Sequence, residues 1–286
     1  MAARIKHIAL ATPDAERAAR FYETVLGMKR AGPTHSGIAA GCYLTDGYIN
    51  LALLTYRSEK AAGPLGMGYA GIHHFGWQVD DVDEMRARIE ANGGKFFLDL
   101  PVDRATLNYE MKFTDPDGQI FDISKSGWIG TKDGWSASPA APKIKHIALS
   151  VSDPDRTARF YETVFGMKRI GPNGSAAAAR GFYLTDGHIN LAVLHFLSDK
   201  VAGPLGKDFV GIHHFGYVVD DLDGCVKTIT DNGGRLFHDM PERRQALNYE
   251  MKFLDLDGQI FDISHNGWAG TAEGAAHAKA KEAATA

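Results

Sequence analysis

The sequence contains one long unit twice, and this duplication limits the possible folds more than any other feature. Residues 4–131 and 143–271 are the two copies. The period is far longer than that of solenoid repeats, so each copy should fold as a domain rather than as a stacking module. We predict a first domain over 1–131, a linker rich in Pro and Ala over 132–142, a second domain over 143–271 and a flexible tail over 272–286.

Each copy also divides into two similar halves. In the first half, residues 5–11 alternate like a strand, and an amphipathic helix opens at Pro13–Asp14 and ends at Gly27. Three further strands follow, and the second half repeats this order. The three strands of the first half are expected at 28–31, 38–45 and 48–56. The second half is expected to contain strands at 72–79, 95–99, 107–114 and 119–124 and a helix at 81–91. The order predicts an α+β fold in which two βαβββ modules form a curved mixed sheet around a concave site.

Strand alternation predicts which side chains meet on the concave face. His73 and His213 are expected to point to the opposite face and to be structural. The residues expected on the concave face are His7, Asn50, His74, Glu110, Lys112 and Asp122 in the first copy, and His146, Asn190, His214, Glu250, Lys252 and Asp262 in the second.

A carboxylate between apolar neighbours is costly unless it is paired or binds a metal. Two neutral imidazoles and a carboxylate form a set that suits Fe²⁺, Mn²⁺, Zn²⁺ or Ni²⁺. Other interpretations stay open: the histidines could be hydrogen-bonded in a metal-free cup, and Asp122 could pair with Lys112. Glu110 could form an ion pair with Lys112, or it could act as a ligand or general base. Trp128 and Trp268 could rim a pocket or pack at the sheet edge.

The chain resembles the vicinal oxygen chelate superfamily of glyoxalases, extradiol dioxygenases and bleomycin resistance proteins. The segments that carry the resemblance are Lys6-His7-Ile8-Ala9-Leu10, the helix end Phe21-Tyr22-Glu23 to Gly27, His74-Phe75-Gly76, and 115–122. Carried over by position, the resemblance implies the metal ligands His7, His74, Asp122, His146, His214 and Asp262.

Several positions depart from the family pattern. The last ligand is usually Glu, whereas both copies have Asp. Asn50 and Asn190 stand where glyoxalase I has a carboxylate that serves as ligand and base. The His and Tyr of the extradiol signature are also absent, because Asp103, Arg104, Ala105 and Lys112 occupy those places. The second copy has Leu256 where the first has Pro116.

The resemblance therefore implies a metal-dependent enzyme that acts on a small substrate with vicinal oxygens. We lean towards a dioxygenase with Fe²⁺, because the triad has two His and one carboxylate, and Mn²⁺, Zn²⁺ or Ni²⁺ are alternatives. A glyoxalase-type lyase or isomerase and a non-catalytic small-molecule-binding protein are the competing hypotheses. Glu110, Lys112, Glu250 and Lys252 are the candidate catalytic residues.

Composition limits the remaining possibilities. The formal net charge of −4 and the lack of a basic stripe disfavour nucleic acid and anionic membranes as partners. The two cysteines are not equivalent in the repeat, which favours a reducing cytoplasm, and no secretory signal is expected. A monomer or a homodimer is expected. Each cup could close within one repeat or between halves of the two repeats.

Overall fold

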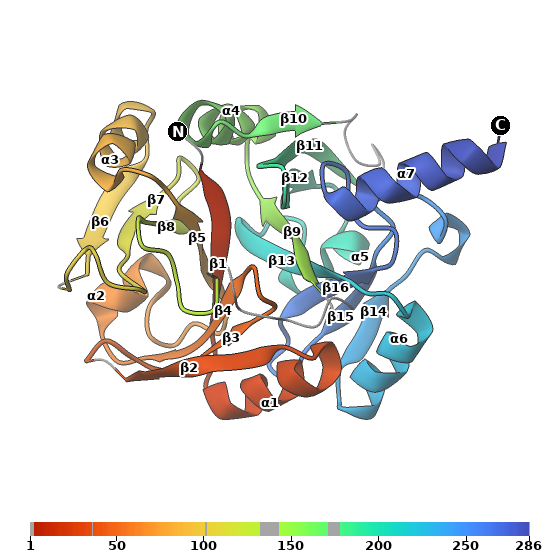
Figure 1. Ribbon diagram of the computed structural model, residues 1–286, viewed down its shortest axis with the longest axis horizontal. Helices are drawn as coiled ribbons and strands as arrows, with labels where there is room; N and C mark the ends of the chain where they lie inside the picture. The colour runs from red at the N-terminus through yellow and green to blue at the C-terminus, as the bar shows by residue number, and fades with distance from the viewer. Residues whose placement is uncertain (1–2, 36, 101, 132–142, 171–177, 286) are drawn as a thin grey trace. The chain divides into compact units, whose positions relative to one another are not determined.

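The computed structural model describes residues 3–35, 37–100, 102–131, 143–170 and 178–285. The chain divides into two compact units, one built mainly from the first repeat and the other from the second (Figure 1). The linker predicted over 132–142 lies outside the described residues. None of the helices in the described part combines the length and apolar character that crossing a membrane requires.

The first unit contains eight strands. They are β1 (Arg4–Ala11), β2 (Lys29–His35), β3 (Ala39–Thr45), β4 (Asn50–Tyr56), β5 (Gly71–Gln78), β6 (Lys95–Asp99), β7 (Met111–Thr114) and β8 (Ile120–Ser124). Its helices are α1 (Ala15–Leu26), the short α2 (Glu59–Ala62), the 3₁₀ turn η1 (Gly63–Leu65) and α3 (Val82–Ala91).

All eight strands form one sheet in the order β2-β3-β4-β1-β5-β8-β7-β6. β1 runs parallel to β4 and β5 runs parallel to β8, whereas β1 and β5 are antiparallel. The sheet thus joins two βαβββ halves through the β1–β5 pair, which confirms the predicted mixed sheet. Because every strand comes from the same repeat, the cup closes within one repeat rather than between the two.

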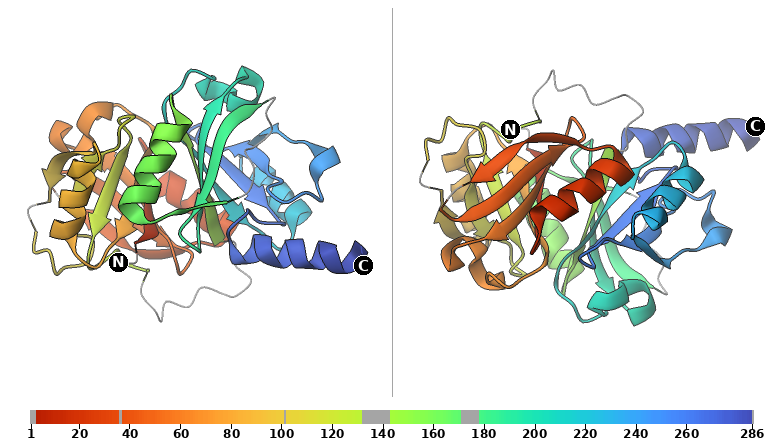
Figure 2. Two further views of the ribbon diagram at one scale, coloured as in Figure 1. Left: turned by 90° about the horizontal axis from the view of Figure 1, so that it is seen from above. Right: turned by 90° about the horizontal axis from the view of Figure 1, so that it is seen from below.

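Helix α1 forms for the reasons that its sequence suggests. Asp14 caps it by accepting a hydrogen bond from the Arg17 backbone N–H at 2.9 Å, and Gly27 ends it in the left-handed region at φ 62°. Its buried face includes Phe21 and Tyr22 and lies against β3 and β4 (Figure 2). This packing leaves the opposite face of the sheet free to carry polar side chains.

The second unit repeats this architecture. Its strands are β9 (Lys143–Ser150), β10 (Lys168–Ile170), β11 (Ala179–Thr185), β12 (Asn190–Phe196), β13 (Gly211–Val218), β14 (Arg235–His238), β15 (Met251–Leu254) and β16 (Ile260–Ser264), in the order β10-β11-β12-β9-β13-β16-β15-β14. Its helices are α4 (Pro154–Phe165), α5 (Asp199–Ala202), η2 (Gly203–Leu205), α6 (Leu222–Asp231), η3 (Pro241–Arg243) and α7 (Ala272–Thr285).

Two expectations from the sequence differ from the structure. The strand predicted over 107–114 begins only at Met111, because Asn108 has a left-handed backbone at φ 62° that interrupts extended structure. The tail predicted to be flexible over 272–286 forms helix α7 over Ala272–Thr285. Its Ala, Glu and Lys content explains this, since these residues have high helix propensity.

Candidate metal centre in each repeat

The centre of each sheet carries a row of five residues that are paired directly across neighbouring strands. We call this set the polar row. In the first unit it runs across β4, β1, β5, β8 and β7 as Asn50, His7, Gly76, Asp122 and Lys112. Directly paired residues project to the same face of a sheet. The register therefore brings Asn50, His7, Asp122 and Lys112 to one face, as strand alternation predicts.

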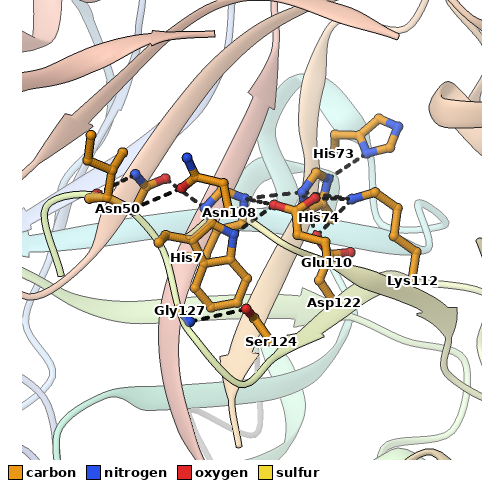
Figure 3. A network of polar contacts seen from close by, with 12 residues as sticks. His7, Asn50, His73, His74, Asn108, Glu110, Lys112, Asp122, Ser124 and Gly127 are labelled. Carbon is orange, nitrogen blue, oxygen red and sulfur yellow. Dashed lines mark hydrogen bonds and ion pairs between the residues drawn. The ribbon is translucent and has the colours of Figure 1, made fainter. Parts of the chain in front are cut away.

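His74 joins this face because it lies two residues before Gly76 on β5. The pairing of β1 with β5 shifts between Ala9 and Leu10, so that His74 pairs with Ala9 and Ile72 with Leu10. His73 is the extra residue of this β-bulge. The prediction that His73 points to the opposite face is wrong, because the bulge breaks the alternation. The ring nitrogens Nδ1 of His73 and His74 lie 2.9 Å apart (Figure 3).

The same correction applies in the second unit. The register shifts between Ile212 and His214, which makes His213 the extra residue. Its Nδ1 lies 2.7 Å from Nδ1 of His214, and its Nε2 lies 2.9 Å from the carbonyl oxygen of Ala202. His213 therefore supports the neighbouring imidazole rather than facing away from it.

The hydrogen bonds of Asn50 assign the proton of His7. The Asn50 amide nitrogen donates to the carbonyl oxygen of Ile129 at 2.8 Å, so its Oδ1 is the atom that faces His7 Nδ1, also at 2.8 Å. Nδ1 of His7 must then carry the hydrogen, which leaves a lone pair on Nε2. Burial lowers the pKa of His7 and keeps its ring neutral.

A second chain of hydrogen bonds assigns the proton of His74. Nε2 of His73 donates to the carbonyl oxygen of Ala62 at 2.9 Å, so Nδ1 of His73 is an acceptor. Nδ1 of His74 faces that acceptor and must carry the hydrogen, which leaves a lone pair on His74 Nε2. Burial, with the nearby Lys112 ammonium, holds the pKa of His74 well below its usual value.

The lone pairs on Nε2 of His7 and Nε2 of His74 face two carboxylates. Nε2 of His7 and Nε2 of His74 lie 3.2 Å apart, and neither carries a hydrogen to share. Asp122 Oδ2 lies 3.1 Å from His74 Nε2, and Glu110 Oε1 lies 3.6 Å from His7 Nε2. Ligand atoms of these four residues, which we call the first cluster, all lie within 4.8 Å of one another. Four facing donor atoms of this kind form a set that could hold a cation.

One further atom supports a cation. Asp122 is completely buried, and its Oδ1 has no hydrogen-bond partner among the described residues. In the second unit, Asp262 Oδ1 is also buried and has no hydrogen-bond partner within the part of the chain that the structure describes. A buried carboxylate oxygen without a partner is costly, and a divalent ion would satisfy it. The donor set therefore fits a divalent metal, which His7, His74, Asp122 and Glu110 would hold.

Lys112 reaches into the first cluster from β7 (Figure 3). Its ammonium lies 2.7 Å from Asp122 Oδ2, 2.9 Å from Glu110 Oε2 and 3.4 Å from His74 Nε2. Burial disfavours the charge, but Asp122 and Glu110 outweigh it and raise the pKa of Lys112 above its ordinary value. The Lys112–Asp122 and Lys112–Glu110 ion pairs, which the sequence left open, are therefore both present beside the imidazoles.

Trp128 closes the cluster from the loop after β8. Its ring stacks on His7 with centroids 4.8 Å apart and an interplanar angle of 3°, and its Nε1–H donates to Glu110 Oε1 at 2.7 Å. Gly76 makes this approach possible, since a Cβ there would lie 2.6 Å from the indole ring. The sequence did not reveal this role, because alternation cannot place a side chain from a loop.

The second cluster consists of His146, His214, Glu250 and Asp262. Its distances match those of the first, with 3.2 Å between the two imidazole nitrogens and 2.6 Å between Lys252 Nζ and Asp262 Oδ2. Burial lowers the pKa of His146 to about 4 and that of His213 to about 3. Burial opposes ionisation of Glu250, but Lys252 lowers its pKa to about 2.

A pocket of about 480 Å³ opens onto the first cluster, which is a volume typical of small-molecule sites. Lys112 is the one cationic side chain among its described lining residues. His7, His74, Glu110 and Lys112 form its polar end, and apolar side chains such as Leu54, Leu100 and Leu107 form its walls. The pocket is therefore suited to a small, largely apolar molecule with polar atoms at one end.

Family comparison agrees with this geometry. The model of the Glyoxalase/Bleomycin resistance protein/Dioxygenase superfamily matches residues 4–123 and 143–263. The chain belongs to this superfamily. Its two matches coincide with the two cups, so each cup is one superfamily module.

Two known plant proteins resemble part of the chain. A probable chloroplastic lactoylglutathione lyase of Arabidopsis thaliana is 28% identical over 173 residues, which cover 58% of this chain and 45% of that protein. A lactoylglutathione lyase of the same plant is 25% identical over 172 residues, which cover 58% of this chain and 56% of that protein. The match thus spans about half the length of these relatives.

Two solved structures share the fold. A mutant 4-hydroxymandelate synthase from Streptomyces coelicolor has a TM-score of 0.71 at 15% identity and covers 96% of both chains. A Mn(II)-bound glyoxalase from Novosphingobium aromaticivorans has a TM-score of 0.65 at 21% identity. The match covers 91% of this chain and 81% of that glyoxalase chain. At these identities the likeness concerns the fold alone.

Proposed function

We propose that the protein is a metal-dependent enzyme that acts on a small substrate with two neighbouring oxygen atoms. One observation carries the proposal: in both repeats two imidazole Nε2 atoms lie 3.2 Å apart and face a buried aspartate and a glutamate, which is buried in the first repeat and half-buried in the second. His7, His74, Asp122 and Glu110 would hold the ion in the first cup. A divalent ion there supplies Lewis-acid stabilisation of negative charge that develops on the substrate oxygens.

The residues of the first cup would bind and orient the substrate. The apolar walls of the pocket would exclude water from the substrate, and its polar end would place the oxygens beside His7 and His74, which both line it. Glu110 lines the same pocket, and the N–H of Trp128 fixes its Oε1. A carboxylate held in this way can take a proton from a substrate carbon next to a carbonyl group.

The second carboxylate bears on the reaction class. The lean towards a dioxygenase rested on two imidazoles and one carboxylate, whereas Glu110 adds a second carboxylate to the cluster. A carboxylate base is what proton transfer needs, so the geometry favours a lyase or isomerase over ring cleavage. A set of two imidazoles and two carboxylates suits Fe²⁺, Mn²⁺, Zn²⁺ and Ni²⁺ alike.

The test has two parts. Protein purified without a histidine tag should contain close to two divalent ions per chain by elemental analysis. It should then be assayed in D₂O with 2-oxoaldehyde hemithioacetals, 2-hydroxyketones and catechols, following solvent deuterium entry by NMR and oxygen uptake by electrode. Deuterium entry without oxygen uptake supports a lyase or isomerase, and oxygen uptake on a catechol supports the dioxygenase.

Variants at the proposed base sharpen the result. The double variant Glu110→Gln and Glu250→Gln should lose at least 100-fold in turnover while its circular dichroism spectrum stays unchanged. Glu84→Gln is the matched control, because Glu84 is exposed on α3. Unchanged turnover in the double variant would contradict the role of these carboxylates.

A second candidate function rests on Lys112. Its ammonium contacts both carboxylates of the first cluster, so these carboxylates have a cation of the protein's own, which suits a non-catalytic cup that sequesters a small molecule. Protein that contains no divalent ion at either cluster, shows no turnover and still binds a small apolar ligand would favour this function.

A further inference from the structure

Lys112 and Lys252 occupy their clusters in a way that a ligand-orienting residue would not. Each ammonium contacts two carboxylates and one imidazole nitrogen at the same time. We propose that each lysine is a built-in cation that competes with the divalent ion for its cluster, so that the lysine sets the affinity for metal. This inference rests on the proposed function, since it concerns the loading of the same metal centre.

The competition follows from a single lone pair. His74 Nδ1 carries the hydrogen of the ring, because it faces the acceptor nitrogen of His73. His74 Nε2 then has one lone pair, which can accept an N–H of Lys112 or bind a metal, but cannot do both. The 3.4 Å contact between Lys112 Nζ and His74 Nε2 must therefore break when a metal binds.

Charge adds to this argument. Lys112 and Asp122 are 3% and 0% exposed, so solvent screens their charges little. An ammonium and a divalent ion a few ångströms apart in such surroundings repel each other strongly. Lys112 also lines the 480 Å³ pocket, which offers the side chain space beside the cluster when it leaves.

The lysine is an incomplete substitute for a metal. It satisfies His74 Nε2, Asp122 Oδ2 and Glu110 Oε2, but it leaves Asp122 Oδ1 without a partner among the described residues. The ammonium therefore stabilises the metal-free cup without filling every donor. A divalent ion that binds all of these donor atoms can displace the ammonium. Its affinity for the cluster is lowered by the free energy needed to move the lysine.

The experiment measures metal binding rather than activity. Mn²⁺ is titrated by calorimetry into chelator-treated full-length protein, first wild type and then Lys112→Gln, Lys252→Gln and the double variant. Lys112→Gln should tighten one of the two sites at least tenfold, and the double variant should tighten both. Lys112→Arg, which keeps the cation, and Lys95→Gln, which removes an exposed lysine, should bind Mn²⁺ no more tightly than wild type.

Thermal unfolding gives a second readout. In chelator, Lys112→Gln should melt several degrees below wild type, because two buried carboxylates lose their cation. Mn²⁺ should raise the melting temperature of the variant much more than that of wild type. If Lys112→Gln does not fold in chelator, it is refolded with Mn²⁺ and compared with Lys112→Met prepared in the same way.

The outcomes separate this inference from the proposed function. Mn²⁺ binding by wild type with equal or weaker binding by Lys112→Gln overturns the competition and leaves the metal centre intact. No binding by wild type with tight binding by the double variant supports the competition but contradicts a metal enzyme in the native chain. No binding by any of these proteins overturns both.

Discussion

The two cups agree at their centres and differ in their walls. Both contain the polar row, the histidine pair, the lysine and the stacked tryptophan, with matching distances. Around this centre Tyr56 is replaced by Phe196, and Leu98 by His238. Val102, which lines the first pocket, corresponds to Glu242 in the second repeat. Duplication has kept the donor set and changed the residues around it. Under the proposed function, the two cups would therefore perform the same chemistry on different molecules.

The exchange of Leu98 for His238 shows the difference most clearly. Leu98 is buried in an apolar cluster with Leu54 and Tyr56. His238 is also buried, but its Nε2 has no hydrogen-bond partner among the described residues. Burial, together with the nearby Lys252, lowers the pKa of His238. An unsatisfied imidazole in the second cup is a polar group that a ligand could contact, and the first cup has an apolar side chain there.

The largest predicted effect is on stability in acid, and the second repeat should lose at least as much stability as the first. Each repeat buries three imidazoles at its centre whose pKa lies below the ordinary 6.5, for example His146 at about 4 and His213 at about 3, and the second repeat also buries His238, whose pKa is lowered. As pH falls below 6.5 the unfolded chain takes up protons that the folded chain does not. The free energy of unfolding therefore falls, by up to about 1.4 kcal/mol per pH unit for each imidazole.

Urea unfolding of chelator-treated protein from pH 7.5 to 4.5, followed by hydrogen exchange in each repeat, measures this effect. Both repeats should lose stability over the same pH range, and stability should be level above pH 7. A loss confined to one repeat would show that the two centres are not equivalent.

The next effect tests the close approach of tryptophan to the sheet. Gly76→Ala and Gly216→Ala would each place a Cβ 2.6 Å from an indole ring, and overpacking of this kind costs about 1–3 kcal/mol. Urea unfolding should show similar losses for the two variants. Gly118→Ala is unsuitable as a control because of its positive φ, whereas Gly68→Ala has open space and is suitable. A loss for Gly76→Ala no larger than that for Gly68→Ala would contradict the packing.

The sequence predicted the centre of the fold better than its edges. Alternation brought His7, Asn50, Lys112 and Asp122 to one face because regular strands have a period of two. It failed at His73, where a bulge inserts one residue, since no local residue type announces a bulge.

The contacts of Trp128 could not be predicted from the sequence either. It lies in a loop whose path depends on the finished sheet, and its ring reaches His7 only because Gly76 has no side chain. The metal roles of these residues remain predictions.

A smaller effect is expected from exchanging the residues that distinguish the walls. His238→Leu should stabilise the second unit by about 1–2 kcal/mol, because it removes a buried polar atom that has no partner. Leu98→His should destabilise the first unit by a similar amount. Thermal unfolding of the two variants and of the double exchange measures both changes. Destabilisation by His238→Leu would mean that the imidazole has a partner in solution.

The smallest effect concerns the hydroxyl group of Tyr56. It lies 3.1 Å from His73 Nδ1, and the second repeat has Phe196 in its place. Tyr56→Phe should cost about 1 kcal/mol of stability and leave the metal stoichiometry unchanged, because His213 and His214 keep their contact without a hydroxyl. Loss of one bound ion in Tyr56→Phe would show that the first centre depends on this hydroxyl.

The central claim is that each repeat holds one divalent ion between its two imidazoles and its carboxylates. Anomalous X-ray diffraction from crystals grown with Mn²⁺ tests it directly. The account predicts two manganese peaks per chain, one within bonding distance of His7 Nε2 and His74 Nε2 and one at the same place beside His146 and His214. Manganese absent from both clusters, with Lys112 and Lys252 still seated between their carboxylates, would contradict it.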